Sequence, residues 1–269
     1  MRMGFIGGGN MAAAIIGGMV RGGFTPEDIV VVEPVAERRE WLTRTWGIQV
    51  APEASAGLTA DVIVLAVKPQ QLREVLQHLP ALRPEQLVLS VAAGVRAADI
   101  SRWLRGHAAV VRAMPNTPAL VSLGAIGAFA TPGVSAQQRE WAAQVLSAVG
   151  LVAWVDSEAQ IDAVTAISGS GPAYVFYFIE ALERAALQQG LPADTARALT
   201  LQTFLGAATL ALQGDAPPAE LRARVTSKGG TTERGIAALE AGDVAAVIGQ
   251  AAAAAAARAR ELGDVLGAD

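Results

Sequence analysis

Small hydroxyl side chains and two adjacent glycines gather late in the chain, in the segment TSKGGTTERG at residues 226–235. Gly229 and Gly230 come just before a helical pattern that starts at Thr231, where the first N–H groups of a helix have no intrahelical partner. With hydroxyls and the helix dipole, such N–H groups are suited to holding a carboxylate. A loop whose hydroxyls only cap the helix is the alternative, and the residue types leave both interpretations open.

A second group of glycines lies near the N-terminus, in GGGNMA, between an apolar run and a helical pattern that begins near Asn10. In this G-x-G-x-x-A spacing, Gly7 permits a tight turn, Gly9 lets the backbone approach a pyrophosphate, and a small Ala12 packs against the strand. The motif predicts a dinucleotide cofactor and leaves NAD, NADP and FAD open. The predicted contacts in this turn are Gly7, Gly8, Gly9, Asn10, Met11 and Ala12.

An acidic residue, Glu33, ends the second predicted strand, about 20 residues after the glycine-rich turn. A carboxylate at this position typically accepts hydrogen bonds from the adenosine ribose hydroxyls, which favours NAD over a cofactor with a 2′-phosphate. Arg38 and Arg39 follow closely and would neutralise such a phosphate if they turned inward; as solvated helix residues they would not. The sequence leaves the choice between NADH and NADPH open.

Short apolar runs alternate with helical patterns up to about residue 156, which predicts a parallel sheet covered by helices on both faces. The motifs AVKPQ, SVAAGV and MPNTP follow later strands of this sheet, where an open sheet binds its ligands. Beyond residue 157 only helical patterns remain, so we expect a doubly wound α/β domain at 1–157 and an all-helical domain at 158–269. The predicted strands are 1–7, 28–33, 61–67, 86–91, 108–114, 125–131 and 151–156, and the predicted helices of the second domain are 158–167, 172–190, 192–213, 217–226, 231–241 and 243–263.

The predicted helix at 172–190 is apolar on more than one face. It is either the core helix of the second domain or, because a small helical domain has little interior, part of a contact with another subunit. We favour the subunit contact.

Composition narrows the class of protein. The 269 residues carry a net charge of −4 with 52% hydrophobic residues, and an acidic protein is a poor partner for nucleic acid. There is no cysteine, and His78 and His107 have no ligand-like spacing, so no metal site is predicted. We see neither a signal peptide nor a membrane segment and expect a cytoplasmic protein that binds metabolites.

Acid–base motifs of the usual dehydrogenase kinds are not recognisable in the sequence. Hydride transfer to a protonated imine needs little proton chemistry from the protein, since the substrate already carries the positive charge. A scaffold that mainly positions its reactants therefore fits imine reduction.

The chain as a whole resembles pyrroline-5-carboxylate reductase. The resemblance rests on GFIGGGNMA, AVKPQ, SVAAGV, RAMPNTPALV, ISGSGPAYVFYFIEAL and, most specifically, LRARVTSKGGTTERGIAALE. It implies a Rossmann domain, a helical domain that interlocks with its partner in a homodimer, and often a larger ring of dimers. It also implies reduction of the C=N bond of 1-pyrroline-5-carboxylate to L-proline by NADPH or NADH, the last step of proline biosynthesis.

The resemblance also implies roles for individual residues. Thr232 would hydrogen-bond the ring nitrogen of the substrate, which makes it the candidate proton donor. The carboxylate would be held by Ser227, Gly229, Gly230 and Thr231, and the nicotinamide and its ribose would be bordered by Ala66, Val67, Lys68, Pro69, Ala92, Ala93, Gly94 and Asn116.

This sequence departs from the family at two places that bear on the cofactor. Many members have a small polar residue where Glu33 stands, and an asparagine in the loop that here reads VAPEASAG. Two other functions are weighed against the reductase. A 3-hydroxy acid dehydrogenase would carry a lysine in the helix that here reads PAYVFYFIEAL, and a dinucleotide-sensing regulator would not need the SKGGTT loop.

Overall fold

The computed structural model describes residues 1–268, apart from the side chains of residues 54 and 55. The chain forms two compact units. The first comprises residues 1–170 together with the last part of the chain from residue 254, and the second comprises residues 171–253.

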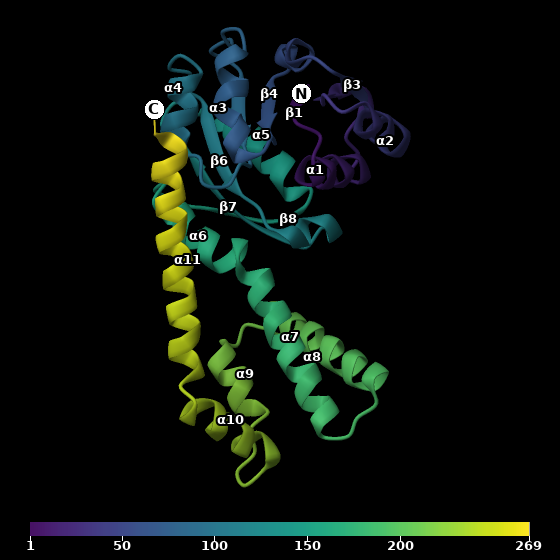
Figure 1. Cartoon of the computed structure of the whole chain (residues 1–269), viewed down its shortest axis with the longest axis vertical. Coiled ribbons are helices and arrows are strands. Elements are labelled where there is room, and N and C mark those ends of the chain that lie inside the picture. Colours follow the sequence, from purple (N-terminus) through teal and green to yellow (C-terminus); the bar gives the residue numbers. More distant parts are fainter. Residues whose placement is uncertain (269) are drawn as a thin grey trace. The chain divides into compact units, whose positions relative to one another are not determined.

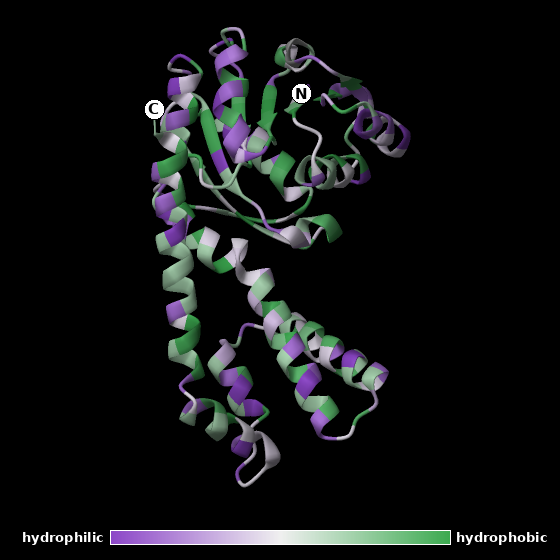
Figure 2. Cartoon of the chain, viewed as in Figure 1, coloured by the Kyte–Doolittle hydropathy of each residue, from purple (hydrophilic) through white to green (hydrophobic). Residues whose placement is uncertain are grey.

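The first unit is built on a sheet that has eight strands in the described part of the chain, in the order β3-β2-β1-β4-β5-β6-β7-β8. Figure 1 labels several of these strands and the helices around them. The central strands β1, β4 and β5 of the sheet are fully buried and apolar except for Ser90 at the end of β5, as expected for strands covered on both faces; hydropathy is mapped in Figure 2. The strands are β1 Met3–Ile6, β2 Ile29–Val32, β3 Gln49–Ala51, β4 Val62–Leu65, β5 Leu87–Ser90, β6 Val110–Met114, β7 Gly124–Ala130 and β8 Gly150–Trp154.

Helices cover both faces of this sheet, which confirms the predicted doubly wound α/β fold. Successive side chains of β1 enter opposite cores: Phe5 packs with residues of α1 and α5, and Ile6 packs with residues of α3 and α4. Each such buried side chain contributes roughly 1.5–3 kcal/mol to folding. The helices are α1 Asn10–Arg21, α2 Ala36–Trp46, α3 Pro69–His78, α4 Ala97–Trp103, α5 Ala136–Ser147 and α6 Gln160–Val164, with 3-10 turns η1 Pro26–Asp28, η2 Ala54–Thr59 and η3 Thr117–Val121 and a π-helical turn η4 Thr165–Gly169.

The sheet differs from the prediction in two respects. Strand β3 was not predicted, because its three residues at the sheet edge are too few to give a periodic pattern. Strand β7 runs antiparallel to β6, so the sheet is not purely parallel. The connection from β6 to β7 contains only the turn η3, which is too short for the crossover that a parallel pair requires.

The compact units also divide the chain at positions other than the predicted boundary between 157 and 158. Segments α6 and η4 belong to the first unit because they pack on β7: a Cβ atom on Gly127 would lie 2.5 Å from a methyl group of Val164. The end of α11, Val244–Gly267, belongs there too. Arg96 Nη2 donates to Asp264 Oδ1 over 2.6 Å, and Leu266 packs against the core that contains Ile6.

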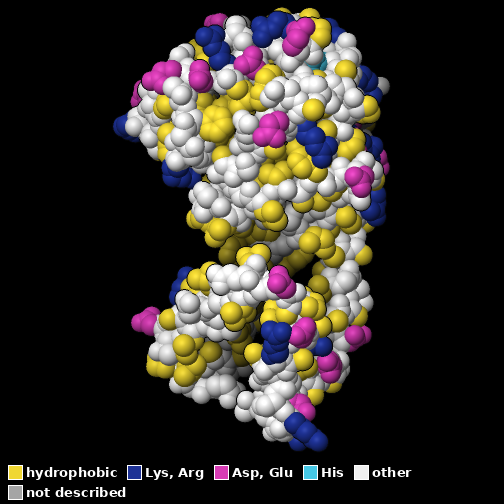
Figure 3. Space-filling model, turned by 180° about the vertical axis from the view of Figure 1, so that it is seen from behind, with side chains coloured by type: hydrophobic (Ala, Val, Ile, Leu, Met, Phe, Trp, Pro, Cys, Tyr) yellow, Lys and Arg dark blue, Asp and Glu magenta, His cyan; other side chains and the backbone are white. Residues whose placement is uncertain are grey.

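The second unit is entirely helical, as predicted. It contains α7 Gly171–Gln188, α8 Ala193–Gln213, α9 Pro218–Arg224, α10 Thr231–Ala241 and the first part of α11. Within residues 171–253, all of which the structure describes, only Ala196 and Thr200 are buried. Large apolar side chains therefore lie on the surface of this unit, in the lower part of Figure 3.

Among the described residues, no single helix is long and apolar enough to cross a membrane. The pair α10 and α11, bent by 51°, passes that test by length and composition alone.

Candidate active site

The glycine-rich turn joins β1 to α1 at the carboxyl end of the sheet. Gly7 has φ +99°, and its N–H donates to Val32 O over 2.9 Å. A Cβ atom there would lie 2.8 Å from Ala66 O, so only glycine fits this turn without strain. The predicted tight turn at Gly7 is what the structure has.

The next residues leave the N-terminus of α1 open. Gly9 is the N-cap of α1, without a side-chain hydrogen bond, and a Cβ atom on it would meet only Ala66 O, at 4.0 Å. Asn10 is the first residue of α1, and Ala12, in the first turn of the same helix, is fully buried. Open backbone at Gly9 and uncapped N–H groups at a helix start suit the pyrophosphate of a dinucleotide.

Strand order places this turn at the switch point of the sheet. The chain runs from β1 outward to β2 and β3, and then returns to β4 on the other side of β1. Ligands of open α/β sheets bind in the crevice at this reversal, outside the carboxyl ends of the strands. The segments after β4 and β5 begin at the same edge: Ala66 N donates to Ile6 O over 2.8 Å, and Val91 N donates to Leu65 O over 3.1 Å.

The residues predicted to border the nicotinamide follow these strand ends. After β4, Ala66 and Val67 are half-buried, Lys68 is exposed, and Pro69 begins α3. After β5, Ala92 and Gly94 are buried and Ala93 is exposed. The structure therefore brings these residues to the same sheet edge as the glycine-rich turn.

Glu33 lies directly after β2 and is a buried residue, 9% exposed. Its Oε2 accepts from Gly8 N over 3.0 Å, and its Oε1 accepts from Val35 N over 2.9 Å. The carboxylate is thus attached to the glycine-rich turn itself. Sequence reasoning placed Glu33 beside the cofactor but did not predict this link.

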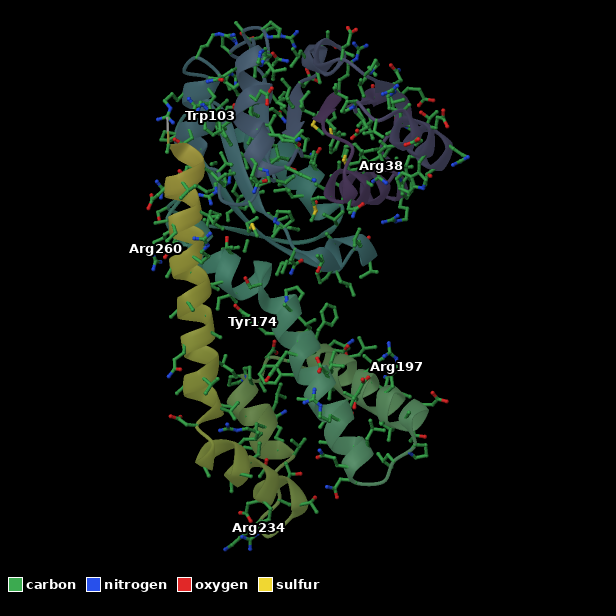
Figure 4. The ribbon with its side chains drawn as sticks, viewed as in Figure 1. Arg38, Trp103, Tyr174, Arg197, Arg234 and Arg260 are labelled. Carbon is green, nitrogen blue, oxygen red and sulfur yellow. The ribbon has the colours of Figure 1, made fainter. Side chains whose placement is uncertain are left out.

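The first two arginines of α2, Arg38 and Arg39, are fixed by backbone carbonyl groups. Arg38 Nε donates to Gly8 O over 2.7 Å, and Arg39 Nη1 donates to Glu33 O and Pro34 O over 2.8 and 2.7 Å. The guanidinium carbon of Arg38, the residue labelled in Figure 4, also lies 4.2 Å from the centre of the Trp41 ring. Trp41 was not among the predicted site residues, although an aromatic residue three positions after an arginine on a helix lies on the same face.

Asn116, predicted to border the nicotinamide, has its side chain bound within the fold. Its Nδ2 donates to Ser168 O over 2.9 Å, and its Oδ1 accepts from Ala125 N over 3.0 Å. With 8% of its surface exposed, Asn116 links the end of β6 to β7 and η4.

The late glycine pair lies in the second unit, between α9 and α10. Gly229 has φ +74°, and its N–H donates to Glu233 Oε2 over 2.7 Å. Gly230 is the N-cap of α10, where no side-chain cap is formed, and its N–H donates to Ser227 O over 3.0 Å. The N-cap of α10 therefore receives no hydrogen bond from a loop hydroxyl, in contrast to the capping alternative.

The hydroxyl groups of this loop are exposed on Ser227, Thr231 and Thr232. The contact of Glu233 with Gly229 was not predicted, but its position is a recognisable signal. A glutamate three residues after the N-cap Gly230 commonly reaches back to the backbone before the helix.

Two known protein families match different parts of this chain. Residues 158–262 match the family described as pyrroline-5-carboxylate reductase dimerisation, and residues 2–94 match the family NADP oxidoreductase coenzyme F420-dependent. A pyrroline-5-carboxylate reductase from Pseudomonas aeruginosa is 50% identical over 268 residues, covering 99% of this chain and 98% of that protein. The chain belongs to the pyrroline-5-carboxylate reductase family. It is accordingly an oxidoreductase with an NAD(P)-binding Rossmann domain, as the resemblance implied.

Solved structures agree with membership of the pyrroline-5-carboxylate reductase family. The enzyme from Coxiella burnetii superposes with a TM-score of 0.93 at 44% identity, covering 97% of this chain and 98% of that one. The enzyme from Plasmodium falciparum, solved with NADP bound, gives a TM-score of 0.84 at 27% identity and covers 98% of both chains.

Proposed function

We propose that this protein is a pyrroline-5-carboxylate reductase, which reduces the C=N bond of 1-pyrroline-5-carboxylate to L-proline in the last step of proline biosynthesis. The near full-length identity of 50% to a reductase of that name carries the proposal. The reduced nicotinamide of NADPH or NADH, when bound, supplies the hydride that the imine carbon accepts.

The glycine-rich turn is the proposed pyrophosphate site. Its open backbone at Gly9 and the uncapped N-terminus of α1 support this role. The ends of β4, β5 and β6 would border the nicotinamide through Ala66, Val67, Lys68, Pro69, Ala92, Ala93, Gly94 and Asn116.

The late loop is the proposed substrate site. The N–H groups of Gly229, Gly230 and Thr231 and the hydroxyl of Ser227 would hold the substrate carboxylate at the start of α10, with Gly229 and Gly230 exchanging their contacts to Glu233 and Ser227 O for the substrate. Thr232 would hydrogen-bond the ring nitrogen and be the candidate donor of the proton that the neutral amine gains after hydride transfer, its hydroxyl recovering that proton from water. The absence of a hydroxyl cap on α10 supports this assignment, because it leaves these hydroxyls available to a ligand.

The helical unit is the proposed dimerisation surface, within a substrate and dimerisation domain at 158–269 that follows the Rossmann domain at 1–157. The dimerisation family match supports a homodimer. So does α7, whose Phe176 and Tyr177 are 64% and 71% exposed in the single chain. We also propose a cytoplasmic location, no nucleic-acid or membrane partner, and association of dimers into a larger ring.

The function is tested by following oxidation of NADH and of NADPH with 1-pyrroline-5-carboxylate as substrate. A reductase consumes the cofactor only when the imine is present and releases proline. Consumption with a 3-hydroxy acid and oxidised cofactor instead would identify a hydroxy acid dehydrogenase. Cofactor binding without turnover would identify a sensor.

The role of Thr232 is tested by Thr232→Ala. We expect kcat to fall by about 10²-fold or more while the affinity for NAD(P)H stays unchanged, because a proton-donating contact to the substrate is lost. Thr226→Ala is the matched control, since the Thr226 hydroxyl donates to Arg222 O in the preceding helix α9. Equal kcat in Thr232→Ala and wild type would refute the donor role.

The dimer contact of α7 is tested by Phe176→Ala. Loss of a large side chain from a subunit contact should weaken the dimer, measured by sedimentation over a range of protein concentrations. A dimer of unchanged stability would show that Phe176 lies outside the subunit contact.

A further inference from the structure

The peptide group of Gly8 is held from both sides by charged side chains. Its N–H donates to Glu33 Oε2 over 3.0 Å, and its carbonyl oxygen accepts from Arg38 Nε over 2.7 Å. Glu33 is thereby fixed between the glycine-rich turn and Val35 N, at the end of β2. Two backbone N–H groups therefore orient the carboxylate of Glu33, and one of them, Gly8 N, belongs to the glycine-rich turn proposed to contact the cofactor.

A Cβ atom on Gly8 shows how closely Glu33 approaches this turn. It would lie 2.7 Å from Leu42 Cδ1 and 3.2 Å from Glu33 Oε2, so the space beside Gly8 is filled by these side chains. The register between β1 and β2 aligns Ile6 with Val32, which sets the glycine-rich turn beside Glu33. The negative charge is therefore fixed at the strand end where the ribose of a dinucleotide is recognised.

The neighbouring arginines, Arg38 and Arg39, are each bound to backbone carbonyl groups of the glycine-rich turn or of the end of β2. Arg39 Nη1 donates to two carbonyl oxygens, of Glu33 and Pro34. Arg38 is bound to Gly8 O through Nε and stacked on Trp41, and its Nη2 is shielded from solvent without a hydrogen-bond partner. These hydrogen bonds use Nε of Arg38 and Nη1 of Arg39, so a 2′-phosphate would meet only the other nitrogens of the two guanidinium groups, beside the fixed carboxylate of Glu33.

We propose that Glu33 makes this protein selective for NADH over NADPH, an inference that rests on the proposed function as an NAD(P)H-dependent reductase. Each carboxylate oxygen of Glu33 accepts one backbone hydrogen bond and keeps further acceptor capacity for ribose hydroxyls. A 2′-phosphate at the same place meets a fixed like charge, which is costly when water is excluded. Arg38 is a positioning residue in this scheme, because it acts on the cofactor through the Gly8 peptide.

The experiment measures the dissociation constants of NADH and NADPH from nicotinamide fluorescence, without substrate. We expect wild type to bind NADH at least about tenfold more tightly than NADPH, and Glu33→Ser to shift this ratio at least about tenfold toward NADPH. Equal binding of the two cofactors by wild type, or an unshifted ratio in Glu33→Ser, overturns the proposal.

Two further variants separate charge at Glu33 from general effects. Glu33→Gln keeps the shape of the side chain and should also move the ratio toward NADPH, while thermal unfolding confirms that the turn is intact. Glu37→Gln removes an exposed negative charge nearby, in the first turn of α2, and should leave the ratio within about twofold of wild type. A shift as large in Glu37→Gln as in Glu33→Gln would contradict a specific role for Glu33.

Failure of this proposal and failure of the proposed function are distinguishable. Binding selectivity is measured without the imine, so an NADH-selective protein that does not reduce pyrroline-5-carboxylate would retain the inference about Glu33 and reject the substrate. A protein that reduces the imine equally well with both cofactors would confirm the substrate and reject the inference about Glu33.

Discussion

Asn116 Nδ2 donates a hydrogen bond of 2.9 Å to the carbonyl oxygen of Ser168, joining the end of β6 to the π-helical turn η4. In that turn Ser170 N donates to Thr165 O, five residues back. Single π-helical turns are often found at functional sites. Because Asn116 Oδ1 also accepts from Ala125 N, the side chain fixes the loop after β6, which the family resemblance assigns to the nicotinamide border.

Replacing this residue tests its structural role. Asn116→Ala leaves Ala125 N without its partner, and we expect the free energy of unfolding to fall by about 1–3 kcal/mol. Urea denaturation measures the change. Asn116→Asp restores the acceptor for Ala125 N but places a carboxylate oxygen against Ser168 O, so it should also destabilise. An unchanged midpoint in both variants would show that these hydrogen bonds are not needed.

A buried ion pair should contribute more to stability than the exposed pairs. Arg112 in β6 is 4% exposed, and its Nη1 lies 3.1 Å from Glu158 Oε1, which also accepts from Ala97 N at the start of α4. Asp162 lies 3.8 Å from Nη2 of the same arginine. Removing the guanidinium therefore leaves two acidic groups in a partly buried place without their cation.

We expect Arg112→Met to lower the free energy of unfolding by about 3–5 kcal/mol. Arg184→Met is the matched control: Arg184 also donates to a glutamate, Glu180, over 2.6 Å, but both side chains are about two-thirds exposed. Its loss should cost less than about 1 kcal/mol. Equal effects of the two substitutions in urea denaturation would contradict the assignment.

Glu233 occupies a backbone donor that the proposed substrate site requires. Its Oε2 accepts from Gly229 N over 2.7 Å, so in the free protein a side-chain carboxylate lies where the substrate carboxylate is expected to bind. Glu233→Gln weakens this competing contact and removes a like charge. We expect KM for pyrroline-5-carboxylate to fall about two- to fivefold with kcat within about twofold, because an exposed contact of this kind is worth about 1 kcal/mol or less.

Steady-state kinetics at saturating cofactor provides the measurement. Glu220→Gln, which removes an exposed glutamate paired with Arg224 on α9, is a control for the loss of one negative charge from the same unit. A raised KM in Glu233→Gln would mean that Glu233 shapes the loop for the substrate instead of competing with it.

The sequence predicted the elements whose signals are local. The spacing of Gly7, Gly9 and Ala12 after an apolar strand was sufficient to predict the glycine-rich turn. Helical periodicity was sufficient to predict that the second unit is helical. The reversal of β7 was missed because strand direction depends on how β6 and β7 pair, and the apolar run of β7 is the same in either direction. The contacts of Glu33 with Gly8 were missed because they join residues that only the sheet register brings together.

The same limit applies to boundaries. Segment α6 has the helical composition of the second unit, yet it packs on β7, where Val164 lies beside Gly127. Local sequence reports which segments are helical, whereas packing against a distant strand decides the compact unit to which a helix belongs.

A buried histidine gives the fold a pH dependence that can be measured. His107 is 9% exposed, and its Nε2 lies 2.9 Å from Gln86 O, to which it donates as the Nε2–H tautomer. Burial lowers the pKa of His107 below its ordinary value of 6.5, and hydrogen bonds to the backbone of Gln86 and Ala109 oppose this shift. The unfolded chain therefore binds the proton more readily than the folded protein does.

Because the folded-state pKa lies below the unfolded value, the contribution of neutral His107 is fully present above about pH 6.5 and is lost as pH falls through the folded-state pKa. Urea denaturation between pH 7.5 and pH 5 should show the free energy of unfolding decreasing with falling pH. His107→Gln removes the titrating group, and its free energy of unfolding should decrease less over the same interval. The same decrease in wild type and His107→Gln would assign the pH dependence to other groups, whatever the difference in stability at pH 7.5.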